Sequence, residues 1–350
     1  MKTEAALLVE LNAPLQLVEI GIPALKSGQV LVEISHSGVC HTQILEARGR
    51  RGPDPFVPHC LGHEGVGRVL ETGEGVSKVR VGDQVILGWI KGVGADVPGT
   101  VYDWQGRKVN AGGVTTFQRH AVVSENRLVS LPDGVDPHAA VLLGCAAPTG
   151  FGAVLNTAEA RTGQSFAVVG IGGVGLCAIV AAVAEGCAPV IAIDRNPERL
   201  KFAAAAGASH MLNPADGDLA KLIKALVPGG LDAVIEATGS VAVMESALEW
   251  VRPRGGRVVV VGNAPADATF RVDPRQLNQG KRLLGCWGGD SLPDRDMARY
   301  AELLKAGVIQ SGLLKAKAYP LHEINQALDD LEQGKVGRPI IDMGLRLTKA

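Results

Sequence analysis

The sequence has almost no charge imbalance and no run of like charges. Its 350 residues carry 35 Lys and Arg against 36 Asp and Glu, for a formal net charge of -1. A surface for nucleic acid or anionic lipid needs a clustered excess of Lys and Arg, and neither a basic block nor an acidic tail occurs. The composition therefore argues against nucleic acid and against a membrane as the main partner.

Hydrophobic segments typical of secretion or membrane insertion are also missing. The N-terminal stretch MKTEAALLVELNAP contains Glu4 and Glu10 and lacks the apolar core of a signal peptide. The most apolar stretch, SFAVVGIGGVGLCAIVAAVAEG at 165–186, approaches the length of a membrane helix but contains five glycines. Those glycines favour a buried strand, turn and helix. We expect a cytoplasmic protein.

Cysteines are sparse, and no CxxC pair occurs. The six cysteines are Cys40, Cys60, Cys145, Cys177, Cys187 and Cys286. In a chain of this length they are too few for a disulfide scaffold. Most are expected to be small, buried, apolar side chains.

Two kinds of segment follow one another along the chain. The first 145 residues are rich in predicted strands, such as QVLVEISHSG and VGDQVILGW, which favours short strands curled into a barrel-like sheet. From about Phe151, predicted strands alternate with helical stretches, as in PVIAID followed by PERLKFAAAAGA. This alternation predicts a parallel sheet with helices on both faces, so the fold class is α/β.

A glycine motif lies inside the α/β part. The segment VVGIGGVGL places Gly170, Gly172 and Gly175 in a GxGxxG pattern between a predicted strand and helix, and Asp194 follows 19 residues beyond Gly175. Such glycines let backbone N–H groups approach a pyrophosphate, and the carboxylate can accept hydrogen bonds from a ribose diol. The alternative is a glycine turn in a nucleotide-free domain. Asp194 would repel a 2′-phosphate, which favours NAD over NADP, although Arg195 is adjacent.

Three residues could form a metal site. Cys40 in GVCHTQ, His63 in LGHEGVG and Cys145 in LLGCAAPTG are residue types that bind catalytic zinc, which takes three protein ligands and keeps one position open. Spacing alone does not decide the question. A buried Cys40, a hydrogen-bonded His63 and a core Cys145 would give the same pattern.

A resemblance to a known protein family bears on both the nucleotide site and the metal site. The segments that carry it occur in the family's order: GVCHT, GHEGVG, GDQVI, TTFQRHAVV, LLGCAAPTGFGAV, VVGIGGVG, GCWGGDSLPD and GKVGRPII. Together they resemble the zinc-dependent medium-chain alcohol dehydrogenases, with a layout similar to the liver-type and glutathione-dependent formaldehyde dehydrogenases. The resemblance implies a β-rich, GroES-like catalytic domain at 1–148 and 289–350. It also implies a doubly wound Rossmann domain that binds the dinucleotide at 149–288.

The resemblance also implies roles for single residues. Cys40, His63 and Cys145 correspond to the catalytic zinc ligands, Thr42 to the hydroxyl that bonds the substrate oxygen, and Glu64 to a carboxylate close to the metal. Trp89 corresponds to a residue of the substrate pocket. The expected cofactor-binding residues, including those of the glycine motif, are His41, Thr149, Gly170, Gly172, Gly173, Val174, Gly175, Asp194, Arg195 and Arg338, of which Arg338 can also pair with Glu64.

The sequence departs from the family pattern in three places. Many relatives hold a structural zinc with four cysteines after the position of Trp89, but the segment 91–113 has no cysteine. We therefore expect one zinc per chain, with the segment ordered by packing of Tyr102 and Trp104 or by a subunit contact. Gln43 replaces the aspartate that orients the zinc-bound histidine, and its amide oxygen is expected to accept the imidazole N–H. Leu45 replaces the histidine that ends the proton relay.

The expected function is hydride transfer between an alcohol, or its aldehyde or ketone, and NAD(H), with zinc at the reacting oxygen. A polyol, amino-sugar or cyclitol dehydrogenase is the alternative within enzymes, because the polar Asn263 stands where relatives often have an apolar residue. A non-catalytic NAD-binding module is the alternative outside enzymes. We expect a small-molecule substrate and a homodimer or homotetramer that pairs through the strand RLLGCWGG.

Overall fold

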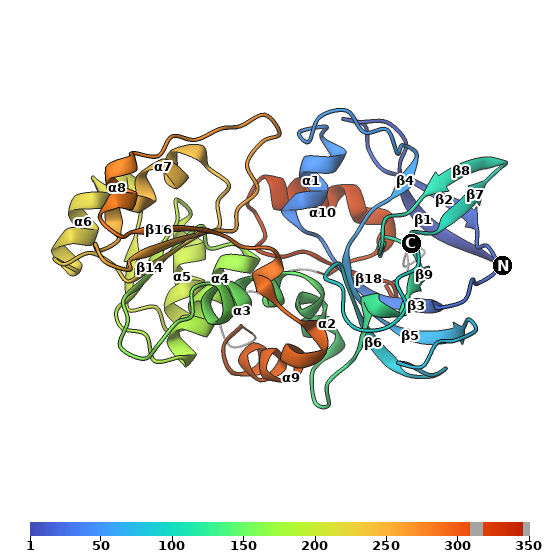
Figure 1. The fold of residues 1–350 in the computed structure, drawn as a ribbon. Coiled ribbons are helices and arrows are strands. Elements are labelled where there is room, and N and C mark those ends of the chain that lie inside the picture. The colour runs from blue at the N-terminus through green and yellow to red at the C-terminus, as the bar shows by residue number, and fades with distance from the viewer. Residues whose placement is uncertain (309–317, 346–350) are drawn as a thin grey trace. The chain divides into compact units, whose positions relative to one another are not determined.

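The computed structural model describes residues 1–308 and 318–345, which form two compact units (Figure 1). Unit 1 contains 1–145, 292–301 and 318–345, and unit 2 contains 146–291 and 302–308. The stretches 309–317 and 346–350 of the expected catalytic domain lie outside the described residues.

Unit 1 is built mainly of strands. Its strands are β1 (Lys2–Leu8), β2 (Gln16–Gly21), β3 (Gln29–Gly38), β4 (His59–Cys60), β5 (Glu64–Thr72), β6 (Gln84–Gly88), β7 (Val101–Trp104), β8 (Arg107–Asn110), β9 (His120–Ser124), β10 (Leu128–Ser130), β17 (Ala318–Tyr319) and β18 (Ile340–Asp342). Its helices are α1 (His41–Ala47), α2 (Pro137–Ala140) and α10 (Ile324–Glu332), with 3₁₀ turns η1 (Glu125–Arg127), η2 (Val141–Gly144) and η8 (Leu321–Glu323). Helix α9 (Pro293–Leu303) begins in this unit.

The strands of unit 1 form two sheets, which confirms the expected β-rich architecture. Strands β1, β2, β7, β8 and β4 close into a barrel, and the second sheet has the order β10-β6-β5-β3-β18-β17, with β9 also paired to β3. Alternate side chains of β3 point into the unit's main core, where Val30, Val32 and Ile34 are buried. Figure 1 shows α1 and α10 beside one another in this unit, and Arg48 after α1 forms ion pairs with Asp329 and Glu332 of α10.

Unit 2 alternates strands and helices. Its strands are β11 (Phe166–Val169), β12 (Val190–Ile193), β13 (His210–Leu212), β14 (Ala233–Glu236), β15 (Arg257–Val260) and β16 (Arg282–Gly285). Its helices are α3 (Ala146–Gly152), α4 (Gly173–Ala184), α5 (Pro197–Ala205), α6 (Leu219–Leu226), α7 (Val241–Trp250) and α8 (Pro274–Asn278). Short turns complete it: η3 (Ala153–Thr157), η4 (Pro214–Asp216), η5 (Gly288–Asp290) and η6 (Leu304–Val308).

The sheet of unit 2 is parallel and doubly wound. Its strand order is β13-β12-β11-β14-β15-β16, so the chain reverses direction across the sheet between β11 and β14. Strands β11, β12 and β14 are buried throughout, as expected for apolar strands covered on both faces. In such sheets ligands bind at the carboxyl ends of the strands where the order reverses. The predicted Rossmann architecture is confirmed.

Among the described residues, no single helix is long and apolar enough to cross a membrane. In that part of the chain, one bent pair of helices is long and apolar enough when taken together: Pro137–Gly144 with Ala146–Thr157. Most residues of this pair are buried inside the protein.

A buried carboxylate links the start of the cysteine-free segment 91–113 to the loop between β5 and β6. Glu125 accepts backbone N–H groups from Ser77 at 3.0 Å, Lys78 at 3.3 Å and Ala95 at 2.9 Å. Burial alone would raise the pKa of Glu125, but these three donors outweigh it and hold the pKa below its usual value. Tyr102 is buried as expected, and its hydroxyl oxygen accepts the backbone N–H of Val122.

We expect Glu125→Gln to lower the free energy of unfolding at pH 7 by about 1–3 kcal/mol, because an amide NH₂ would face a backbone donor. A depressed carboxyl pKa stabilises the fold above the unfolded-state value of about 4.3, and that stabilisation is lost as pH falls through the folded-state pKa. The difference in the free energy of unfolding between wild type and Glu125→Gln, measured by urea denaturation, should therefore shrink below about pH 4. Glu71→Gln, at an exposed position of β5, is the control. Equal stability of the Glu125 variant at pH 7 would contradict the assignment.

Candidate functional site

Three predicted metal ligands meet inside unit 1. Cys40 directly precedes α1, His63 lies between β4 and β5, and Cys145 follows η2. One ligand atom from each lies within 4.8 Å of the others, and no other group of three His, Cys, Asp or Glu in 1–308 and 318–345 meets that condition. Cys40 and Cys145 are buried. The fold therefore brings together residues separated by 105 positions in the sequence.

The charges of these groups depend on one another. A hydrogen bond from the Cys145 thiol, opposed by burial, lowers the pKa of Cys40 well below its usual value, with Arg338 and His63 acting in the same direction. The same bond raises the pKa of Cys145. The two thiols therefore shift one another's pKa in opposite directions, and thiolate is the form of cysteine that binds zinc.

A buried ion pair borders the three ligands. The Arg338 guanidinium donates from Nη2 to Glu64 Oε1, and both side chains are almost inaccessible. Burial opposes the charge of Arg338, but Glu64 and Cys40 outweigh it and raise its pKa. The second carboxylate oxygen of Glu64 and Nε of Arg338 have no hydrogen-bond partner in the described part of the chain. Arg338 thus lies against Glu64, and its predicted contact with the cofactor stays a prediction.

Other predicted site residues lie near the ligands along the chain. Thr42 is in the first turn of α1, and its Oγ1 lies 3.7 Å from Cys40 Sγ. His41, the first residue of α1, is exposed. Trp89 follows β6, whose last residue Gly88 pairs with Glu64, so its backbone lies close to the ligand set. The Trp89 side chain packs partly on the core of unit 1.

Gln43 does not make the expected hydrogen bond. Its amide oxygen accepts the backbone N–H of Cys40 at 2.8 Å, and its amide nitrogen lies 2.5 Å from Nδ1 of His63. The predicted contact between the two side chains exists, but the expectation that the amide oxygen accepts the imidazole N–H is wrong. The oxygen accepts the backbone N–H of Cys40, and the amide nitrogen is the atom that faces the imidazole.

His59 and Cys60 do not join the ligand set. His59 contacts Asp54 Oδ2 from Nε2 at 2.8 Å, and its Nδ1 lies 3.0 Å from the Cys60 carbonyl oxygen. Burial raises the pKa of the Cys60 thiol. Neither residue belongs to the cluster around Cys40.

The donor set fits zinc. Two cysteine sulfurs and one imidazole nitrogen are the ligands of catalytic zinc sites that keep a fourth position open. His63 Nε2 is buried and has no hydrogen-bond partner among the described residues, as expected for a nitrogen reserved for a metal. Zinc would also neutralise the sulfurs that burial makes costly to charge.

At each position of the glycine motif in unit 2, a different structural feature favours glycine. Gly170 adopts a φ of 89°, which favours glycine, at the end of β11. A Cβ on Gly175 would lie 1.9 Å from the Gly170 carbonyl oxygen, so α4 can pack closely only without one. A Cβ on Gly172 would meet nothing within 4 Å, so the backbone before α4 is open to a ligand. Gly173 and Val174 begin that helix.

Asp194 anchors this loop. It follows β12, and its carboxylate accepts the backbone N–H of Ile171 at 2.7 Å and that of Asn196 at 2.8 Å. Arg199 lies 3.8 Å from the same carboxylate, and Arg195 is exposed. Each carboxylate oxygen has further acceptor capacity, so these bonds leave room for a ribose diol.

Thr149 lies on α3, next to the start of α4. A Cβ on its neighbour Gly150 would lie 2.2 Å from the Val174 carbonyl oxygen, so the two helices are in close contact. The Thr149 hydroxyl is buried without a hydrogen-bond partner in the described residues. It is thus placed near the helix whose N-terminus follows the glycine loop.

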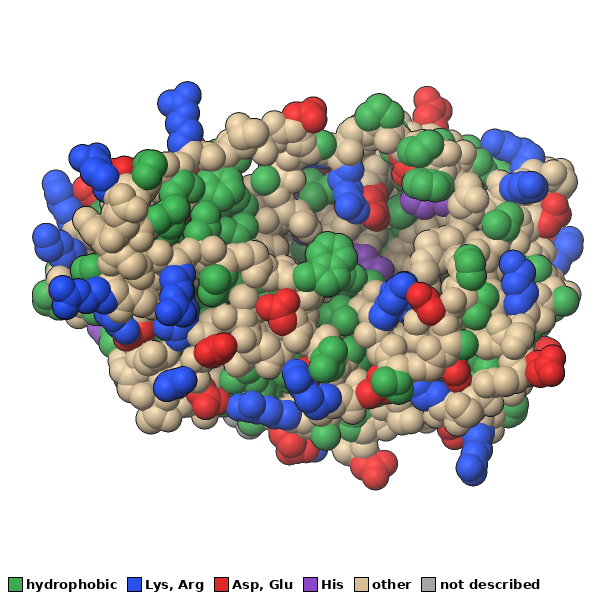
Figure 2. Space-filling view, in the orientation of Figure 1, with side chains coloured by type: hydrophobic (Ala, Val, Ile, Leu, Met, Phe, Trp, Pro, Cys, Tyr) green, Lys and Arg blue, Asp and Glu red, His purple; other side chains and the backbone are tan. Residues whose placement is uncertain are grey.

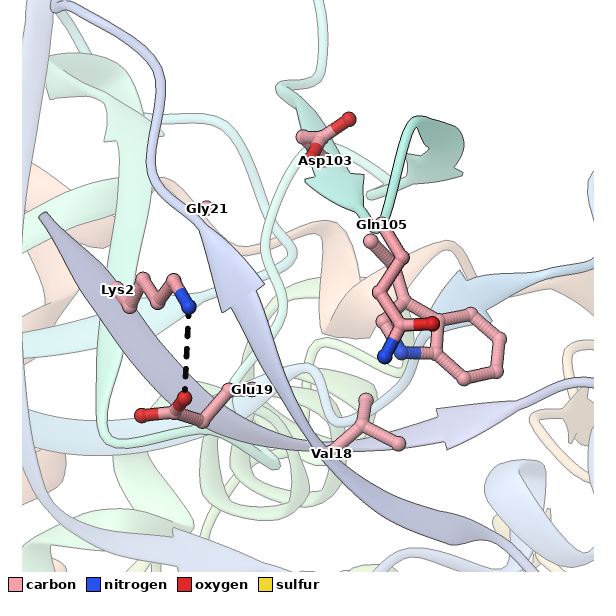
Figure 3. A pocket seen from close by; sticks show the side chains of 7 residues that line it. Lys2, Val18, Glu19, Gly21, Asp103 and Gln105 are labelled. Carbon is pink, nitrogen blue, oxygen red and sulfur yellow. Dashed lines mark ion pairs between the residues drawn. The ribbon is translucent and has the colours of Figure 1, made fainter.

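A shallow depression on unit 1 contains none of these residues. It has a volume of about 500 Å³ and is lined by residues of β1, β2 and β7, among them the ion-paired Lys2 and Glu19 (Figure 3). On the face shown in Figure 2, positive and negative side chains of the described residues are interspersed. That distribution agrees with the balanced composition and with a small-molecule substrate.

Sequence reasoning missed two features of unit 1. Helix α1 was not anticipated, although Cys40 and Gln43 form a capping box at its start. The sequence did not indicate that Glu125 is buried, because a glutamate between predicted strands is usually exposed. A carboxylate that accepts three backbone donors can be found only once the chain is folded.

Comparisons with known proteins agree with this geometry. Residues 26–133 match the alcohol dehydrogenase GroES-like domain, and residues 173–306 match the zinc-binding dehydrogenase family. The chain is 34% identical to an S-(hydroxymethyl)glutathione dehydrogenase of Synechocystis sp., over 97% of this chain and all of the relative.

Solved structures are similar over almost the whole chain. An alcohol dehydrogenase zinc-binding domain protein from Burkholderia ambifaria has a TM-score of 0.90 at 29% identity, covering 99% of this chain and 100% of that one. Benzyl alcohol dehydrogenase from Acinetobacter calcoaceticus has a TM-score of 0.88 at 28% identity, covering 98% and 100%. The chain therefore belongs to the zinc-dependent medium-chain alcohol dehydrogenase family and is a zinc- and NAD-dependent oxidoreductase of alcohols and their carbonyl products.

Proposed function

We propose that unit 1 is the catalytic domain, in which Cys40, His63 and Cys145 hold one zinc ion, and that unit 2 binds NAD through the glycine loop and Asp194. The convergence of the three ligand atoms within 4.8 Å is the observation that carries this assignment. Bound zinc supplies a Lewis acid at the alcohol oxygen, and NAD supplies the hydride acceptor.

The chain's own residues orient the substrate and move its proton. Thr42 Oγ1, beside the ligand Cys40, accepts the proton of the alcohol hydroxyl and passes it on. Leu45 lies one turn further along α1 and has no group that titrates, so the proton passes from Thr42 to water or to His41, the first residue of α1. Arg338 holds Glu64 in place beside the ligands and compensates its buried charge.

The substrate class we propose is a primary alcohol with an apolar or aromatic substituent. Trp89, which follows β6 near the ligand set, supplies an apolar wall. The three arginines of the loop after α1 are already paired: Arg48 and Arg50 with Glu332, and Arg51 with Glu46. Their charge is therefore partly compensated, which weakens their attraction for a substrate carboxylate. The named activity of the 34% identical relative favours S-(hydroxymethyl)glutathione as the second candidate.

A substrate panel tests the proposal. Purified protein should reduce NAD with benzyl alcohol at a higher kcat/KM than with S-(hydroxymethyl)glutathione or a polyol, measured by absorbance of the reduced cofactor. NADP should serve less well, because Asp194 repels a 2′-phosphate. A preference for the glutathione adduct would replace the substrate class and leave the reaction unchanged. A preference for NADP would contradict the role of Asp194.

Metal content tests the ligand assignment. We expect about one zinc per chain by elemental analysis, because catalytic zinc needs three ligands and the structure supplies one such set among its described residues. Cys145→Ala should lose zinc and activity while keeping its circular dichroism spectrum. Cys60→Ala, at a buried cysteine outside the set, is the matched control and should keep both. Retention of zinc by the Cys145 variant would show that the ligands are elsewhere.

We also propose that the protein is a homodimer or a dimer of dimers that pairs through β16. This strand ends the sheet of unit 2, so its outer edge lacks a neighbouring strand within the described chain. Trp287 beyond it is 77% exposed. Light scattering should give a multiple of two chains, and a single chain at micromolar concentration would contradict the proposal.

A further inference from the structure

Trp89 begins a loop that the turn η1 holds in place. Arg127, the last residue of this turn, donates from Nη1 to the carbonyl oxygen of Trp89. The carbonyl oxygen of Asn126 accepts the backbone N–H of Gly92 at 2.7 Å, and Glu125 accepts a backbone N–H further along the loop. Each residue of η1 thus fixes one point of the loop, and Arg127 fixes Trp89.

The sheet pairing of β6 ends just before Trp89. The ladder between β5 and β6 ends at Gly88, which pairs with Glu64, and the ladder between β6 and β10 ends at Leu87. The Trp89 carbonyl oxygen accepts its hydrogen bond from Arg127 rather than from a neighbouring strand. Because a hydrogen bond from a charged group is stronger than one between neutral groups, a single arginine can fix the backbone where the strand ends.

A glycine gives the guanidinium its space. Arg127 is half-buried, and an added Cβ on Gly113 would lie 2.5 Å from its Nη2 and 2.8 Å from its Cζ. The guanidinium therefore lies directly against the backbone at Gly113, in a position from which a side chain there would displace it. An added Cβ on the preceding Gly112 would meet nothing within 4 Å. The two adjacent glycines thus differ in whether a methyl group would disturb Arg127.

Trp89 is an effective pocket wall only when its position is fixed. The indole packs partly on the core of unit 1, and its backbone follows Gly88, which pairs with Glu64 beside the proposed zinc ligands. An aromatic side chain that is ordered before the substrate arrives loses little conformational freedom on binding, and this preorganisation raises affinity. The bond from Arg127 restricts the backbone from which the indole projects.

Resting on the proposed function, in which Trp89 is an apolar wall for the substrate, we propose that Arg127 is a positioning residue that fixes this wall and thereby sets the preference for aromatic over small alcohols. The indole contacts the substituent of the alcohol rather than the reacting carbon, so the effect falls on binding. Loss of the Arg127 bond should therefore raise KM for an aromatic alcohol without lowering kcat. Ethanol lacks the ring that meets this wall.

Arg127→Met removes the donor and keeps an apolar stem. It should raise KM for benzyl alcohol about 3–10-fold, the range that an aromatic contact is worth, with unchanged kcat and unchanged KM for ethanol and for NAD. Arg127→Lys keeps a charged donor and should recover part of the loss. A KM for benzyl alcohol equal to that of wild type in Arg127→Met overturns the proposal. Equal increases in KM for both alcohols indicate a merely structural role and overturn it too.

Gly113→Ala is an independent variant, because it displaces the guanidinium without removing it. Neither Gly112 nor Gly113 has a positive φ, so both backbones accept alanine. Gly113→Ala should reproduce the higher KM for benzyl alcohol, whereas Gly112→Ala, the matched control, should behave as wild type. This pair keeps the test decisive if Arg127→Met does not fold. Identical KM values in the two alanine variants contradict the role of Arg127.

The position of the indole can be measured without substrate or cofactor. The chain has four tryptophans, and the difference in fluorescence between each protein and its Trp89→Ala counterpart isolates the emission of Trp89. Acrylamide should quench this emission more strongly in Arg127→Met and Gly113→Ala than in wild type, and Gly112→Ala should match wild type. Equal quenching in all of these proteins overturns the proposal.

Failure of the proposed function gives a different result. If Trp89→Ala itself leaves KM for benzyl alcohol unchanged, Trp89 is no wall of the pocket, and the role of Arg127 in specificity is wrong together with the proposed substrate class. If Trp89→Ala raises that KM but Arg127→Met and Gly113→Ala do not, the substrate class stands and only the role of Arg127 is wrong.

Discussion

The pairing of β3 with its neighbours is the constraint on which the metal centre depends. Antiparallel pairing of Ser37 with Gly65 brings the end of β3 and the start of β5 together, so Cys40 and His63 meet. On the other side of β3, Gly38 pairs with Ile340 of β18, which places Arg338 beside the same point. A slip of one residue in either register would turn these side chains to opposite faces. The register of this sheet therefore determines the positions of the metal ligands and of Arg338.

Burial of several charged groups at one point has an energetic consequence. Cys40, Glu64 and Arg338 are enclosed together, and buried charges are costly unless they are paired. The Arg338–Glu64 pair compensates one negative charge, and the hydrogen bond from Cys145 lowers the pKa of Cys40. Without metal, the centre thus already has a hydrogen-bonded arrangement of its own. A metal that binds there replaces part of that arrangement, so the partners of the ligands also influence its affinity.

Sequence reasoning predicted the architecture well because its signals are local. The parallel sheet followed from strand and helix alternation, and the roles of Gly170 and Gly175 follow from the conformation and the packing of the turn itself. Cys40, His63 and Cys145 could not be joined by spacing alone, because their approach depends on long-range strand pairing. The resemblance to a family supplied that information. Neither source indicated Glu125, whose donors come from segments 30 and 48 residues away.

Gln43 shows most clearly where prediction from sequence ends. The residue type and its proximity to His63 could be anticipated, but the direction of its amide could not. That direction is decided by the Cys40 N–H, a backbone group at the start of α1 that donates to the amide oxygen. Oε1 of Gln43 therefore serves the start of the helix, and the amide nitrogen is the atom left to face His63. An aspartate or glutamate has two acceptor oxygens, whereas an amide has only one. Glutamine in place of the family's aspartate lengthens the side chain by one methylene group and leaves it a single acceptor.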